Sequence, residues 1–202
     1  MSLQHAILVM LDREPASGYD LTRRFERGIG NFWQASHQQI YQQLARLSEA
    51  GHVSFRVLAQ SGRPDRKVYR LTAAGRRALQ AWLVEPAKAP VVRDALLIKV
   101  FAAHLGDRDT LGTEIDRHLA AHRETLAAHR REEEAYFALD ATRRDAQRLP
   151  YLTLRRGIRY EQEWIVWLEE TRLALQSGRP PDAPVPAITS RPACQGGQGN
   201  VN

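Results

Sequence analysis

A polar helix followed by a basic hairpin constrains this chain more than any other feature of its sequence. Within residues 36–51, apolar side chains recur four and three positions apart, at Ile40, Leu44 and Leu47, which is the spacing of one buried helix face. The other positions carry amide, phenol and guanidinium groups, on Gln38, Gln39, Tyr41, Gln42, Gln43 and Arg46. Such groups can pair with base edges in the major groove of a DNA duplex. A surface helix with polar filler is the competing interpretation.

Two further helices are expected before this one. They cover about residues 3–12 and 18–27, and a Pro- and Gly-containing segment separates them. Ser17 can cap the second helix and Ser36 the third, because a serine hydroxyl accepts a hydrogen bond from a free N–H of the first turn. The sequence therefore predicts three short helices at its start.

A strand–turn–strand unit and a fourth helix are expected next. Residues 53–59 alternate apolar and polar side chains, as in a half-buried strand, and 66–71 form a second strand after a turn at 61–65. Thr72 can cap a helix that reaches Leu83. The order of elements is that of a winged helix-turn-helix domain with a two-stranded wing.

The positive charge of the chain is concentrated in its first part. Residues 1–85 hold 12 Lys and Arg against seven Asp and Glu, whereas the remainder is nearly balanced, with 17 against 16. Seven basic residues fall within 56–77 alone, against the single acidic residue Asp65. A basic N-terminal part points to a polyanionic partner, although Arg-rich surfaces also occur without one.

Composition and motifs exclude several classes of protein. The apolar fraction of 43% suits a globular core, and no apolar run approaches the roughly 20 residues that span a bilayer. The N-terminus lacks the basic start of a secretory signal, and the single Cys194 excludes an internal disulfide and a cysteine-based zinc site. We therefore expect a cytoplasmic protein. Phosphate-loop, dinucleotide-binding and hydrolase motifs are missing, so we expect neither an enzyme nor a cofactor.

The second part of the sequence predicts a helical dimerisation domain in a mainly α protein. A Pro/Ala linker at 86–90 separates the winged-helix domain, 1–85, from this domain, 91–176, and the Pro- and Gly-rich residues 177–202 are expected to be disordered. Helices are expected over residues 93–104, 107–139 and 151–176. The second has near-heptad apolar positions and the third an apolar stripe, which are typical of helices that pair.

Five short motifs, in this order, resemble the PadR family of bacterial transcriptional regulators. They are Leu3-Gln-His-Ala-Ile-Leu, Ser17-Gly-Tyr-Asp-Leu, Ile40-Tyr-x-x-Leu-x-x-Leu, Gly51-His-Val and Arg66-Lys-Val-Tyr-Arg-Leu-Thr-x-x-Gly75. No single motif is specific, but the set is, and it spans about the first 83 residues. The helices that follow resemble the longer members of the family in length and position.

The resemblance implies a homodimer with one winged helix on each side of a pseudo-palindromic operator. It also implies a regulator that usually represses and in some members activates, and some relatives bind small aromatic or hydrophobic effectors. Many members have Pro after the Ile-Tyr pair, whereas Gln42 stands there in this chain. Gln42 offers a hydrogen-bond donor and an acceptor where Pro offers neither, so the base preference of relatives does not carry over.

Candidate contacts with DNA lie on three segments. The N-terminal residues of a recognition helix lie nearest the bases, and here they are Ser36, His37, Gln38, Tyr41 and Gln42. Free backbone N–H groups at the start of the second helix favour a phosphate, which adds Ser17 and Tyr19. The wing is expected to contact phosphate or enter a minor groove through Arg63, Arg66 and Lys67. The alternatives are helix packing for the tyrosine of the recognition helix, simple capping for the serine of the second helix, and a solvated hairpin for the wing.

Two tryptophans and three histidines are the candidates for ligand or metal chemistry in the C-terminal part. Trp164 and Trp167 lie three residues apart and could line an effector pocket at a dimer interface, although such residues more often pack a core. His118, His122 and His129 suggest a metal site or a pH-dependent switch. No carboxylate or cysteine completes an evident zinc site, so we expect solvated or interface histidines and no metal.

A winged-helix module that binds another protein and no DNA is the alternative function. The basic hairpin argues against it, because a protein-binding module has no need of a phosphate-binding charge. Salt-dependent binding to duplex DNA distinguishes the two functions, since a protein-interaction module should show almost none.

Overall fold

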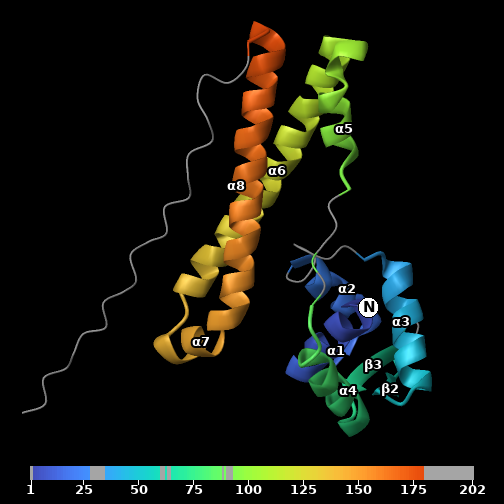
Figure 1. Ribbon diagram of the computed structural model, residues 1–202. Helices are drawn as coiled ribbons and strands as arrows, with labels where there is room; N and C mark the ends of the chain where they lie inside the picture. Colours follow the sequence, from blue (N-terminus) through green and yellow to red (C-terminus); the bar gives the residue numbers. More distant parts are fainter. Residues whose placement is uncertain are drawn as a thin grey trace, which may run out of the picture.

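The computed structural model describes residues 2–27, 35–59, 62, 65–87, 89 and 93–179 of the chain. It contains a small winged-helix part and two long helices that run side by side (Figure 1). The expectation of a disordered segment over 177–202 falls almost wholly outside the described residues. Among the residues that are described, no helix is both long and apolar enough to cross a bilayer.

The predicted order of elements in the winged-helix part is confirmed, with one addition. The elements are α1 (Ser2–Arg13), β1 (Ala16–Ser17), α2 (Gly18–Arg27), α3 (His37–Glu49), β2 (Val53–Leu58), β3 (Arg66–Leu71) and α4 (Ala73–Leu83). Ser36 caps α3 through reciprocal hydrogen bonds with Gln39, and Thr72 caps α4. Both caps are as the sequence predicts, because each hydroxyl stands directly before an apolar helical pattern.

The sheet has three strands where the sequence predicted two. β1 pairs with β3, and β3 pairs with β2, all antiparallel, with Ala16 opposite Tyr69 and Val53 opposite Leu71. A strand of two residues is too short to give an alternating pattern, so sequence periodicity could not reveal β1. Its pairing ties the start of α2 to the base of the wing.

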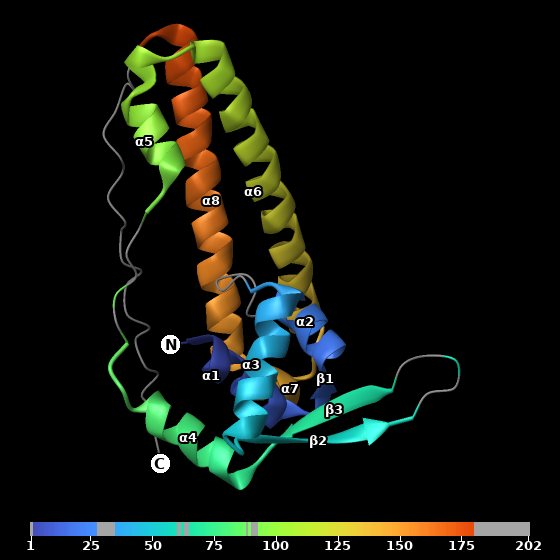
Figure 2. The ribbon, with the colours of Figure 1, turned by 90° about the vertical axis from the view of Figure 1, so that its right-hand side faces the viewer.

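The strand expected over residues 53–59 is confirmed as β2, but it is not half-buried as its pattern indicated. Of β2 only Val53 is buried, and Phe55, Val57 and Leu58 are exposed. The β2–β3 hairpin extends away from the rest of the domain, so beyond its base there is no core for the alternating residues to face (Figure 2). The strand therefore projects as an arm with two accessible sides.

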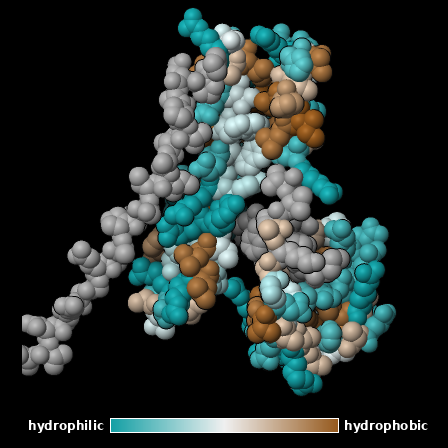
Figure 3. Space-filling view, in the orientation of Figure 1, coloured by the Kyte–Doolittle hydropathy of each residue, from teal (hydrophilic) through white to brown (hydrophobic). Residues whose placement is uncertain are grey.

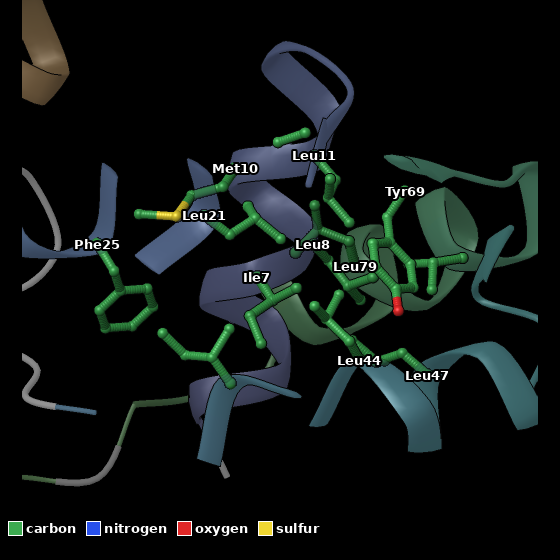
Figure 4. Close-up of a cluster of buried hydrophobic side chains, with 13 residues drawn as sticks. Ile7, Leu8, Met10, Leu11, Leu21, Phe25, Leu44, Leu47, Tyr69 and Leu79 are labelled. Carbon is green, nitrogen blue, oxygen red and sulfur yellow. The ribbon is translucent and has the colours of Figure 1, made fainter. Parts of the chain in front are cut away.

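One apolar core holds the winged-helix part together. Ile7 and Leu8 of α1, Leu21 of α2, and Ile40 and Leu44 of α3 are each at most 1% exposed. Side chains from α1, α2, α3, α4 and β3 converge on this core (Figure 4). Burial of a large aliphatic side chain contributes about 1.5–3 kcal/mol, so this core fixes the orientation of α3.

The C-terminal part follows the predicted helical pattern with three differences. Its elements are α5 (Ala95–Phe101), η2 (Ala103–Leu105), α6 (Arg108–Phe137), α7 (Ala141–Ala146) and α8 (Arg148–Ser177). The helix expected over 93–104 is divided into α5 and η2, and the short helix α7 was not expected. α8 begins three residues earlier than expected because Pro150 falls in its first turn, where no helical hydrogen bond needs the missing N–H.

The apolar stripe of α8 packs against α6 of the same chain. Ile158 and Leu168 of α8 are buried, as are Ile115 and Leu119 of α6. The pairing that the near-heptad positions and the stripe indicate therefore occurs within one chain, because α6 and α8 fold back on each other along most of their length. Any seam between two copies of the chain has to use other surface.

A buried polar cluster interrupts the apolar contact between α6 and α8. Glu161 is 5% exposed, and its Oε2 lies 2.6 Å from Nδ1 of His122. The His122 ring stacks on Trp164 at 5.2 Å between centroids. His129 is 1% exposed, and neither of its ring nitrogens has a hydrogen-bond partner among the residues that the structure describes.

The backbone of α8 lies close to His129 because a glycine faces it. A Cβ atom added at Gly157 would lie 3.2 Å from His129 Nε2. Burial lowers the pKa of His129, and the negative charge of Glu161 opposes this effect only in part. The buried imidazole is therefore favoured in its neutral form.

We predict that His129 makes the protein less stable in mild acid. Because its folded pKa lies below the unfolded value of about 6.5, the unfolded chain binds the proton more readily as the pH falls. The stability that the neutral ring contributes is present above that value and is lost below it. His129→Leu should therefore lose less unfolding free energy between neutral pH and pH ~5 than the wild type, measured by urea unfolding with circular dichroism. The exposed His104→Gln serves as a control, and an equal pH dependence in all three proteins would contradict the prediction.

Candidate nucleic-acid interface

The solvent face of α3 presents the residues that the sequence analysis selected. Its buried side is taken by the core, so Ser36, His37, Gln38, Tyr41 and Gln42 are all exposed. Hydrophilic surface covers α3 on the side that faces solvent (Figure 3). Gln38 and Gln42 lie one helical turn apart and share a face. Their amides are therefore accessible together to a groove of DNA.

In the first turn of α3, two polar side chains that could contact a base are already used in the helix cap. Ser36 Oγ accepts a hydrogen bond from the Gln39 backbone N–H at 3.2 Å, and Gln39 Oε1 accepts one from the Ser36 N–H at 2.9 Å. This capping box engages both side chains within the helix. Gln38 and Gln42 carry no such engagement and are the better candidates for reading a base.

Tyr41 links α3 to the start of α2. Its side chain is 48% exposed, and a Cβ atom added at Gly18 would lie 2.6 Å from Tyr41 Cε1. The ring therefore packs over a position where only glycine fits. This contact is the packing alternative of the sequence analysis, and it holds the exposed part of the phenol beside the N-terminus of α2.

Ser17 is buried, and its hydroxyl serves the N-terminus of α2. Its Oγ donates to Asp20 Oδ2 at 2.8 Å and accepts from the Asp20 N–H at 3.2 Å. The geometry is that of a helix cap, the alternative to a phosphate contact. Tyr19 differs, because it is 57% exposed and lies under the guanidinium of Arg23. Of this pair, Tyr19 has the accessible side chain.

Asp20 is an interface residue that the sequence analysis did not select. Its carboxylate accepts hydrogen bonds from the N–H and hydroxyl of Ser17 and from the guanidinium of Arg66 on β3. Partial burial would raise the pKa of Asp20, but the hydrogen bonds from Ser17 and Arg66 outweigh it and hold that pKa below its ordinary value. The ionised carboxylate thus joins α2 to the wing. Its only signal in the sequence is its place three residues after a capping serine.

The wing carries the basic residues that the sequence predicts to contact phosphate. Lys67 is exposed, with its ammonium 4.7 Å from the centroid of the Phe55 ring across the strand pair, and Phe55 in turn contacts Tyr69. Arg63 lies outside the described residues. Arg66 faces Asp20, so Lys67 is the predicted wing contact whose charge has no carboxylate partner in the part of the wing that is described.

The C-terminal candidates for ligand binding lie within the helix seam. Trp164 stacks on His122 and meets Trp167 edge-on at 5.2 Å, and both indoles pack against the apolar cluster between α6 and α8. Within the described ranges, no three His, Cys, Asp or Glu side chains are placed to hold a metal ion. The role of the two tryptophans in effector binding stays a prediction.

Fold and surface together define a winged helix-turn-helix DNA-binding protein, and comparison with known proteins places it in a family. The transcriptional regulator PadR-like family matches residues 7–81, and the family described as virulence activator alpha C-term matches residues 92–176. This chain belongs to the PadR-like family of transcriptional regulators.

Individual relatives resemble the chain over nearly its whole length. It is 38% identical over 189 residues to the probable transcriptional regulator Rv1176c of Mycobacterium tuberculosis, which covers 89% of this chain and all of that protein. Bacillus subtilis PadR in complex with operator DNA superposes with a TM-score of 0.71 at 27% identity, over 87% of this chain and 99% of PadR. The Vibrio cholerae virulence activator AphA superposes with a TM-score of 0.68 at 35% identity, over 88% of this chain and all of AphA.

We predict that Arg66 and Asp20 contribute to stability as a pair. Removing one partner of an ion pair should remove most of what the other contributes, so Asp20→Asn and Arg66→Gln should be non-additive. For a partly exposed pair the coupling should be about 0.5 kcal/mol, measured as unfolding free energies in a double-mutant cycle. Lys67→Gln, one residue along the strand, should be additive with Asp20→Asn. Equal additivity of both combinations would contradict the pairing.

Proposed function

We propose that this regulator is a repressor that binds a pseudo-palindromic operator as a homodimer and is released by a small hydrophobic or aromatic effector. The observation that carries the proposal is the exposed face of α3, where Gln38 and Gln42 are both accessible on a helix whose opposite face is buried in the core. Accessible amides on such a helix are suited to reading adenine by paired hydrogen bonds. The basic wing beside it supplies affinity for phosphate.

Repression and release are supported by named relatives. A Bacillus subtilis relative, 37% identical over 100 residues, is a negative transcriptional regulator, although the match covers only 55% of that protein. The same regulator has been solved with p-coumaric acid, with a TM-score of 0.67 to this chain. A homodimer that covers an operator represses by excluding other proteins from it. A ligand releases it by favouring a state with lower DNA affinity.

Dimerisation is supported by apolar surface that one chain leaves uncovered. On α5 and η2, Ile98, Phe101 and Leu105 are 70%, 89% and 80% exposed. Apolar residues gather over α5 in the space-filling view (Figure 3). A large contiguous apolar patch is unusual on a monomer and is typical of an interface. We therefore place the contact between two copies on α5 rather than on the inner stripe of α8.

Substitution of Gln42 tests sequence-specific binding by α3. Loss of a bidentate amide contact should cost about 1–3 kcal/mol of discrimination at one base in each half-site. Gln42→Ala should therefore return a relaxed motif in a binding-site selection, symmetrically in both half-sites, with non-specific affinity nearly intact. Gln43→Ala, which changes the same residue type at a half-buried position, is the control. If the wild type and Gln42→Ala return identical motifs, the base contacts have to be sought at Ser36, His37 and Tyr41. If the protein shows no salt-dependent binding to duplex DNA at all, the alternative of a protein-interaction module is favoured.

Substitution of Phe101 tests the dimer surface. An aspartate placed in an apolar interface would be desolvated without a partner, which is costly. Phe101→Asp should therefore shift the protein toward the monomer in size-exclusion chromatography with light scattering, and should weaken operator binding. Leu149→Asp is the control, because Leu149 is also an exposed apolar residue, at 66%, but lies at the beginning of α8, at the end of the helix pair away from α5 (Figure 1). A Phe101→Asp protein with the wild-type mass would show that α5 is not the interface.

A further inference from the structure

A hollow lies at the end of the helix pair where α5 and η2 meet the beginning of α6 and the end of α8. Its volume is about 320 Å³, at the lower end of the range in which proteins hold small ligands. Its apolar lining comes from Val100, Ala103, Ala174 and Leu175. The hollow is therefore large enough for a small molecule and offers that molecule apolar contact on two sides.

The charged side chains that line the hollow are basic. Arg108 of α6 and Arg179 after α8 contribute them, His104 of η2 adds an imidazole, and no aspartate or glutamate is among the described residues that line it. In the part of the chain that is described, neither guanidinium forms an ion pair with a carboxylate. Nearby arginines on the same helices are paired, since Arg172 Nε lies 2.9 Å from Asp116 Oδ1 and Arg123 lies 2.6 Å from Glu169.

Of the two aspartates that flank Arg108 in the sequence, Asp107 has its carboxylate engaged elsewhere. Asp107 Oδ2 accepts hydrogen bonds from the N–H of Thr110 at 2.7 Å and from its hydroxyl at 2.6 Å. It therefore serves as the cap of α6. Within the described ranges, the two guanidinium groups beside the apolar lining have no carboxylate partner. Guanidinium is the side chain best suited to bind a carboxylate or phosphate through paired hydrogen bonds.

We propose that this hollow binds a small molecule with an apolar body and one anionic headgroup, and that Arg108 and Arg179 hold the headgroup. The inference rests on the proposed release by an effector, and it assigns that effector a place and a charge. The apolar body would lie on Val100 and Leu175. Because Val100 precedes the exposed Phe101, occupancy acts on the helix that carries the dimer surface and so reaches the DNA interface indirectly.

The site is distinct from the tryptophan pair of the sequence analysis but adjoins it. Thr171 lines the hollow, and its hydroxyl donates to the carbonyl oxygen of Trp167 at 2.7 Å, one helical turn earlier. A ligand in the hollow thus lies one turn from Trp167, whose fluorescence provides a second measure of binding.

Calorimetric titration of the full chain with cyclohexanecarboxylate tests the site, with the neutral cyclohexanecarboxamide as the matched probe. A charge-assisted contact contributes about 1.5–3 kcal/mol, or roughly tenfold or more in affinity. We expect the acid to bind once per chain and the amide at least about tenfold more weakly. Arg108→Gln and Arg179→Gln should each weaken binding of the acid by about tenfold. Arg159→Gln, an exposed arginine of α8 outside the hollow, should leave it unchanged.

Three outcomes would overturn the proposal. They are equal binding of the acid and the amide, wild-type affinity in both arginine variants, and no binding of the acid at millimolar concentration by a chain that still binds duplex DNA. Ala174→Phe, which fills the hollow, should abolish binding and provides a check that does not depend on charge. Duplex binding measured on the same preparation distinguishes failure of the ligand site from failure of the proposed function. If only the proposed function is wrong, calorimetry still detects binding of the acid.

Discussion

Burial of one face of α3 is the constraint on which the DNA-binding part depends. Ile40, Leu44 and Leu47 are taken into the core formed with α1 and α2. A helix has only one orientation in which these three positions are covered, so Gln38 and Gln42 must face solvent. The proposed reading face is thus a by-product of hydrophobic burial, and the same core sets its orientation. A loss of packing beneath α3 would impair recognition without touching any residue that meets DNA.

The second organising contact is the carboxylate of Asp20. It joins the cap of α2 to the wing through Ser17 and Arg66, and the short strand β1 reinforces the same junction. Ser17 and Arg66, which the sequence predicts to contact phosphate, are therefore used to position the wing. Lys67 and Tyr19 keep their side chains available at the surface. At the start of α2 and in the wing, one residue of each segment thus positions the wing, and its neighbour stays accessible for the proposed contact with DNA.

The C-terminal part departs from the usual distribution of polar and apolar groups at a few positions. His129 and Glu161 are buried inside the helix pair beside the half-buried His122, whereas Ile98 and Phe101 of α5 are exposed. Buried ionisable groups are costly unless they are paired, and exposed apolar patches favour association. We therefore expect the interior of this domain to be sensitive to acid and its exposed apolar patch to suit a partner. The hollow at its end lies between these two regions, beside the helix that would meet the second chain.

The sequence by itself determined most of the fold, because the signals that specify it are local. The apolar spacing of α3, the capping residues Ser36 and Thr72, and the strand at 66–71 follow from periodicity and capping chemistry within a dozen residues, and the structure confirms them. The family resemblance followed from the same short motifs.

Tertiary structure alone decided which side chains are free. Arg66 pairs with Asp20, 46 positions away, and Glu161 contacts His122 of α6, 39 positions away. Neither contact can be recognised from a pattern in the neighbouring sequence. The stripe of α8 was equally compatible with a partner chain or with α6, and only the fold of the chain back on itself settled the matter. Side-chain availability depends on long-range packing and electrostatics, which periodicity within one segment does not contain.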